Sequence, residues 1–179
     1  MHDWNMVVTV HEGSFVRACR LLETMGRVSK TEFFNVLVMQ VDDVRQTLDF
    51  LHQKLVEDPD IPGLLARVVP VTHTFTFQSP EIFETRAREI VSDWIPELAN
   101  KSFHVRMRRR GFKGRMSSMD EERFLDEFLL EALEKTGTPG HIAFDNPDYV
   151  IAVETIGTRA GLSLWSREDL QRYRLVRLD

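Results

Sequence analysis

The stretch from Phe103 to Ser118, FHVRMRRRGFKGRMSS, carries the sequence signals of a strand, a glycine turn and a helix start. Apolar and polar residues alternate over residues 102–108, and this alternation predicts a half-buried strand. Its inward side chains are apolar: Phe103, Val105 and Met107. Its outward side chains are His104, Arg106 and Arg108. The strand is therefore expected to present a basic outer face.

A turn and a helix are expected directly after this strand. Gly111 and Gly114 favour the turn because glycine adopts backbone conformations that other residues avoid. Ser118, followed three residues later by Glu121, matches a capping box and so predicts a helix N-terminus. Apolar residues then recur at helical spacing: Phe124, Leu125, Phe128, Leu129, Ala132 and Leu133. The helix is expected to end near residues 137–140.

Positive charge is concentrated in this stretch although the chain as a whole is acidic. Six of the ten residues from Arg106 to Arg115 are basic, and no acidic residue lies between Glu97 and Asp120. The chain has a net charge of −5, and residues 98–119 contribute +7, so the rest carries −12. One basic patch on a surface that otherwise repels anions indicates a localised anion site.

The residues before this stretch predict strands and helices in alternation. Two β-branched or apolar runs, 5–11 and 31–41, predict strands, and each precedes a helix, one opening at Gly13-Ser14 and one capped by Asp42-Asp43. An extended run over residues 67–78 contains Pro70, as an edge strand or a crossover allows. Two alternatives remain open in the middle. A further strand near residues 26–31 would complete a ferredoxin-like unit, or the run 31–41 contains a turn.

The residues around and after the basic stretch also predict mixed structure. Ser79 and Pro80 suit the N-cap and first position of a helix. Three short strands, over residues 141–144, 149–155 and 159–165, are followed by a helix from Ser166 to about Tyr173. The chain therefore predicts an α+β protein with two lobes, residues 1–77 and 78–179.

Composition and motifs exclude several classes of protein. No apolar run approaches the ~20 residues of a membrane span, and no secretory signal is expected at the start. One cysteine, Cys19, excludes an internal disulfide and favours a reducing cytoplasm. The six histidines show no ligand spacing, and there is no glycine-rich phosphate loop. We therefore expect no catalytic residues, no metal, no cofactor and no membrane partner.

Three stretches resemble the THUMP domain, an RNA-binding module of tRNA-modifying proteins. They are RVVPVTHTF at residues 67–75, FHVRMRRRGFKGRMSS, and the hairpin NPDYVIAVETIGTRAGLSLW at residues 146–165. The first half is similar to the ferredoxin-like domain that accompanies THUMP in such proteins. The resemblance implies an α+β fold in which an N-terminal ferredoxin-like domain, residues 1–77, packs on a C-terminal THUMP domain, residues 78–179.

The resemblance also implies a function. The nearest match is to the stand-alone type that assists tRNA cytidine acetylation, in which THUMP has no catalytic domain attached. It implies a non-enzymatic, cytoplasmic protein that binds the acceptor stem and 3′ end of tRNA. Such a protein presents the tRNA to a separate modifying enzyme, an acetyltransferase in the nearest members. The turn TIGTRAGLS carries one basic residue, Arg159.

The basic stretch supplies the candidate RNA-binding residues. Arginine suits bidentate phosphate contacts, and a helix N-terminus attracts anions. Phe112 either stacks on a base or anchors the turn. The main candidates are Arg106, Arg108, Arg109, Arg110, Phe112, Lys113 and Arg115. The secondary candidates are Lys101, His104, Arg159 and Arg67.

Two other functions remain open from sequence. The acidic remainder suits a protein-interaction module that binds a basic enzyme without contacting RNA. A small ferredoxin-like hydrolase is the third class, but the phosphate loop such hydrolases need is not seen after the first strand. Glu154, within an apolar strand, is either a buried acid with a shifted pKa or a residue engaged by solvent or a salt bridge.

Overall fold

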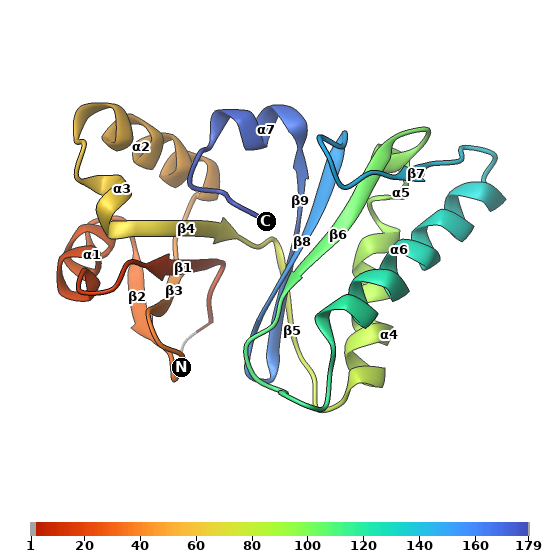
Figure 1. The fold of residues 1–179 in the computed structure, drawn as a ribbon, viewed down its shortest axis with the longest axis horizontal. Coiled ribbons are helices and arrows are strands. Elements are labelled where there is room, and N and C mark those ends of the chain that lie inside the picture. Colours follow the sequence, from red (N-terminus) through yellow and green to blue (C-terminus); the bar gives the residue numbers. More distant parts are fainter. Residues whose placement is uncertain (1–2, 179) are drawn as a thin grey trace. The chain divides into compact units, whose positions relative to one another are not determined.

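The computed structural model describes residues 3–178 and has mixed helices and strands in two sheets (Figure 1). It confirms the predicted α+β class. By contacts the chain divides into two compact units. Unit 1 comprises the described residues up to Val71 together with Leu170–Arg177, and unit 2 comprises Thr72–Asp169 with Leu178. This division differs from the boundary expected after residue 77: residues 72–77 go with unit 2, and residues 170–177 go with unit 1.

Unit 1 contains a four-stranded antiparallel sheet in the order β2-β3-β1-β4. Its strands are β1 (Met6–Val10), β2 (Arg27–Lys30), β3 (Val36–Gln40) and β4 (Leu65–Pro70). Its helices are α1 (Phe15–Glu23), α2 (Val44–Glu57) and the short α3 (Ile61–Leu64). The expected cap of α2 is present, since the Asp43 carboxylate accepts a hydrogen bond from the Gln46 amide at 2.9 Å.

Both alternatives left open for residues 26–41 are realised. A separate strand, β2, follows α1, and residues 31–35 form a turn before β3. Asn35 adopts a left-handed backbone with φ of 57°, a conformation that asparagine tolerates better than most residues. The predicted single strand over residues 31–41 was therefore too long. The continuous apolar run of β3 is explained by its interior position between β2 and β1.

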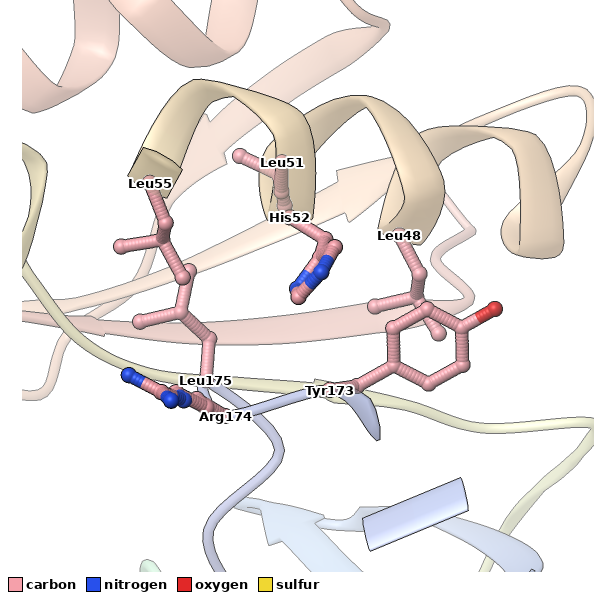
Figure 2. Close-up of a pocket in the computed structure, with 7 residues that line it drawn as sticks. All are labelled: Leu48, Leu51, His52, Leu55, Tyr173, Arg174 and Leu175. Carbon is pink, nitrogen blue, oxygen red and sulfur yellow. The ribbon is translucent and has the colours of Figure 1, made fainter. Parts of the chain in front are cut away.

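The end of the chain packs on α2 of unit 1. The Val68 amide of β4 donates to the Leu175 carbonyl at 2.8 Å, so this segment occupies part of the free edge of β4. Tyr173 Oη donates to Asp49 at 2.7 Å. Figure 2 shows the Tyr173 ring and Leu175 facing the leucines of α2 across a hollow. Its volume of about 10 Å³ is close to the smallest space that one water molecule needs.

Unit 2 contains a five-stranded sheet in the order β5-β9-β8-β6-β7. Its strands are β5 (His73–Thr76), β6 (Ser102–Arg108), β7 (His141–Ile142), β8 (Tyr149–Ile156) and β9 (Arg159–Ser166). Its helices are α4 (Pro80–Ser92), α5 (Ile95–Leu98) and α6 (Ser118–Lys135), while α7 (Arg167–Arg172) runs from unit 2 into unit 1. The run 67–78 is a crossover: it supplies β4 to one sheet and β5 to the other.

Helices α4 and α6 lie side by side on one face of this sheet (Figure 1). The predicted inward residues of β6 are buried in the core between sheet and helices. They meet Leu125, Leu129 and Leu133 of α6 there. Because a β-strand alternates its faces and a helix repeats every 3.6 residues, these two sequence periods assign the core of unit 2 correctly.

The start of α6 differs from the prediction by one residue. Ser117 is the N-cap, and its hydroxyl accepts a hydrogen bond from the Asp120 amide at 3.3 Å. Ser118 is instead the first helical residue. Glu121, expected to reach back in a capping box, is buried and 4% exposed. Two adjacent serines offered the same chemistry, and the geometry of the preceding turn selected the first.

The hydroxyl of Tyr173 gives a test of how the end of the chain is held. We expect Tyr173→Phe to destabilise unit 1 by about 1 kcal/mol, because one hydrogen bond to a charged partner is lost. Urea unfolding followed by circular dichroism measures the change. Tyr149→Phe is the matched control, since the Tyr149 hydroxyl makes no hydrogen bond within residues 3–178. Equal midpoints for the wild type and Tyr173→Phe would contradict this role.

Candidate nucleic-acid interface

The loop between β6 and α6, residues 109–116, carries much of the basic charge and is called the basic loop below. It lies beside the turn between β8 and β9. The Arg110 amide donates to Thr155 Oγ1 at 2.9 Å, and the Gly157 amide donates to the Arg110 carbonyl at 2.8 Å. The backbone of the basic loop is thus bonded to a neighbouring hairpin of the same sheet.

Two glycines allow this close approach. Gly111 has φ of +97°, a conformation essentially restricted to glycine. A Cβ atom at Gly111 would lie 3.0 Å from the Cα atom of Gly157. The sequence predicted that Gly111 favours a turn, and in the structure it also allows a close approach to another part of the chain.

Arg110 is held by an ion pair inside unit 2. Its Nη1 atom lies 2.6 Å from Glu154 Oε2, and the two side chains are 9% and 2% exposed. The salt-bridge alternative for Glu154 is therefore the one observed. The ion pair stabilises both buried groups, because an isolated buried charge is costly.

Phe112 packs inside the turn. Its ring centroid lies 5.0 Å from that of Phe77, and the Arg115 guanidinium carbon lies over the Phe112 ring, 4.6 Å from its centroid. Arg115 Nη2 is also 3.5 Å from the Gln78 carbonyl. Of the two alternatives for Phe112, this geometry is that of an anchor for the turn.

The remaining basic side chains of the stretch differ in exposure. Arg106, Arg108, Lys113 and Arg115 are exposed. Arg106 also donates through Nε to the Leu178 carbonyl at 3.2 Å. Arg109 is half-buried and bonds the Gly111 carbonyl within the basic loop. The sequence could not separate these roles, because all five arginines look alike without their partners.

A hollow of about 510 Å³ opens where the basic loop meets the N-terminus of α6. Amide N–H groups of the first helical turn have no intrahelical acceptor, and the helix dipole is positive there. Arginine side chains at the rim add to this positive field, and Asp120 opposes it. The lining residues are Arg109, Gly114, Arg115, Met116, Ser117, Ser118, Met119 and Asp120.

The secondary candidates lie in different places. Arg159 is at the same end of the sheet as the basic loop and donates to Thr74 Oγ1 at 2.8 Å. Lys101 precedes β6 and so lies about 20 Å away along the strand, at 3.3 Å per residue. Arg67 is buried in unit 1, and its Nε donates to the Arg177 carbonyl at 2.7 Å.

His104 corrects the predicted basic outer face of β6. It is 4% exposed, and its ring lies 5.6 Å from the ring of Phe144. Arg106 and Arg108, on the same face, are exposed as predicted. Alternation identified the correct face but not its burial, because burial depends on what covers each position.

The acidic side of unit 2 is built from α6 and α4. Burial raises the pKa of Glu121 to about 8, and the charge of nearby Glu84 adds to the effect. Burial likewise raises the pKa of Asp126 to about 7. Asp126 Oδ1 accepts from the Val105 amide at 2.9 Å, and Glu122 Oε1 accepts from the Met107 amide at 3.1 Å.

These carboxylates have a structural use. β7 pairs with β6 only at Ser102 and Phe103, so later amides of β6 on that side need other acceptors. Asp126 and Glu122, one helical turn apart, supply them.

Within residues 3–178 no group of three or more His, Cys, Asp or Glu side chains is arranged to hold a metal ion. No helix in that range is long and apolar enough to cross a membrane.

Comparison with known proteins identifies the family. Residues 77–164 match the model of the THUMP domain family. Residues 77–164 therefore form a domain of the THUMP family, which confirms the resemblance seen in the sequence. No curated protein sequence matches the chain significantly.

Solved structures share the fold at low identity. PH1313 from Pyrococcus horikoshii Ot3 has a TM-score of 0.58 at 12% identity, over 92% of this chain and 55% of its own. TrmN from Thermus thermophilus has a TM-score of 0.62 at 20% identity, over 90% of this chain and 45% of its own. A 4-thiouridine synthetase solved in complex with RNA and ATP has a TM-score of 0.52 at 14% identity, over 92% of this chain and 42% of its own. The chain thus spans about half the length of these structures.

Glu121 gives a test of the buried carboxyl groups. An unfolded Glu ionises near pH 4.5, but the folded pKa is about 8, so the folded state binds more protons between these values. We expect the wild type to lose stability as pH rises from 5 to 9, and Glu121→Gln to lose less. The difference in thermal midpoint should therefore be small at pH 5 and favour the variant at pH 9.

Glu131→Gln is the matched control, because Glu131 is exposed on the same helix. Asp126 contributes a loss of stability in the same direction, but it is present in every variant and cancels from the differences. A constant difference between wild type and Glu121→Gln across this pH range would show that Glu121 is not buried in its protonated form.

Proposed function

We propose that this protein binds tRNA through the exposed basic residues around the basic loop. The observation that carries the proposal is the hollow at the N-terminus of α6, which Arg109 and Arg115 line. The exposed residues Arg108 and Lys113 directly precede its lining residues Arg109 and Gly114 in the chain. Phosphate groups suit such a place, because arginine forks and helix N–H groups both bind them. The match of residues 77–164 to the THUMP domain family supports RNA as the source of the phosphates.

Recognition by shape and by single-stranded ends fits this site. Side chains do not read the closed major groove of A-form RNA, so proteins bind its backbone and unpaired ends. A compact basic site on an acidic chain would bind one region of an RNA and repel the rest. The acceptor stem and 3′ end of tRNA, expected from the family resemblance, are the proposed region.

The proposal includes a division into two domains and a non-catalytic role. The strand–helix–strand–strand–helix–strand order of unit 1, with its antiparallel sheet, supports a ferredoxin-like domain. The protein would present tRNA in the cytoplasm to a separate modifying enzyme, an acetyltransferase in the nearest family type. This role is tested by titrating tRNA in the presence of this chain and catalytic amounts of such an enzyme, and measuring tRNA modification. Modification of tRNA by this chain alone would contradict the role.

Salt-dependent binding tests the RNA site. For about five phosphate contacts, log K should fall against log salt with a slope on the order of −4. In Arg108→Ala/Lys113→Ala/Arg115→Ala, three contacts are removed. The slope should flatten by about 2 to 3, and the affinity should fall at low salt. Fluorescence anisotropy with labelled tRNA measures both quantities.

A second triple variant separates a defined site from general attraction. Arg86→Ala/Arg88→Ala/Arg123→Ala removes the same charge from exposed positions on α4 and α6. This control should bind tRNA with nearly the wild-type slope. If both triple variants lose binding equally, net charge rather than the basic loop governs association, and the proposed site is wrong.

A further inference from the structure

We infer that Arg110 and Glu154 form a positioning pair that holds the basic loop ready for RNA without contacting it. The inference rests on the proposed function and assigns different roles within the basic stretch. Arg110 and Glu154 would position the basic loop, whereas Arg108, Lys113 and Arg115 would contact phosphates. From sequence, Arg110 is an RNA-binding candidate like its neighbours.

The ion pair is the first observation. A phosphate contact needs an accessible guanidinium, but the Arg110 side chain is 9% exposed and already lies 2.6 Å from Glu154. Glu154 is 2% exposed and comes from the middle strand of the sheet, β8, which is a rigid support. Releasing Arg110 toward RNA would break this buried ion pair, which is costly.

The backbone contacts are the second observation. The amide and carbonyl of Arg110 are both bonded to the β8–β9 region, through Thr155 Oγ1 and the Gly157 amide. The side chain and the backbone of one residue are thus fixed to the same support. β6 ends at Arg108, two residues before Arg110, so fixing Arg110 also fixes the direction in which the loop leaves Arg108 and continues toward Lys113.

The third observation is a second attachment further along the loop. Phe112 packs on Phe77 of the segment between β5 and α4, and Arg115 lies over the Phe112 ring. The loop is therefore attached at two points on opposite sides of Gly111. A loop ordered before binding costs less to order on binding, and this is the physical advantage of preorganisation.

The slope of log K against log salt distinguishes a residue that positions the loop from a residue that contacts phosphate. The slope counts phosphate contacts, and each contributes about 0.7 to 0.9. We expect Glu154→Gln, which keeps the size of the side chain and the charge of Arg110, to weaken tRNA binding about two- to tenfold with an unchanged slope. Arg108→Met, the matched contact variant, should weaken binding and flatten the slope by about 0.7 to 0.9.

Three results would overturn the inference while leaving the proposed function intact. If Glu154→Gln binds more tightly with a steeper slope, Arg110 is a phosphate ligand that Glu154 competes for. If Glu154→Gln binds like the wild type, the pair has no role in positioning. Arg110→Met/Glu154→Met removes both charges together, and a flattened slope in this variant would equally show that Arg110 contacts phosphate.

Limited trypsin digestion measures the mobility of the basic loop in the absence of RNA. Exposed, mobile loops are cut first, and the basic loop supplies the cleavage sites. In Glu154→Gln, cleavage after the basic residues of the loop should accelerate, while cleavage after Lys135 at the end of α6 stays constant. Equal loop cleavage in the wild type and the variant would overturn the inference, even if the wild type bound no tRNA and the proposed function itself failed.

Discussion

The parallel pairing of β6 with β8 is the constraint on which the rest of unit 2 depends. Its register places Phe103 opposite Tyr149 and Arg108 opposite Glu154. A parallel pair needs a crossover, and α6 with the basic loop provides it. Since the crossover starts where β6 ends, the basic loop necessarily lies at the Glu154 end of β8. The ion pair between Arg110 and Glu154 follows from this register.

The same constraint explains the acidic residues of α6. The crossover helix runs beside β6, whose free amides are only partly paired by the two-residue strand β7. Acidic side chains of α6 accept hydrogen bonds from those amides, and burial raises the pKa of Asp126. The crossover therefore places acidic side chains of α6 beside the free amides of β6 and the basic loop at the end of β6.

Charge in this chain is best understood through its partners. The sequence shows a segment of +7 within a chain of −5. The structure divides that segment: Arg110 is paired internally, Arg109 bonds its own loop, and Arg108, Lys113 and Arg115 are exposed. A basic loop that is already ordered loses less conformational entropy on binding than a flexible basic run does.

The sequence by itself determined the α+β class, most helices and strands, the inward face of β6 and the THUMP family, because these follow from local periodicity, capping chemistry and short motifs. It also located the positive charge. Only the tertiary structure decided that residues 26–40 hold two strands, that residues 170–177 join unit 1, that His104 is buried, and that Arg110 pairs with Glu154. These depend on residues far apart in the chain. Burial and ion pairing arise between such residues, so no local pattern contains them.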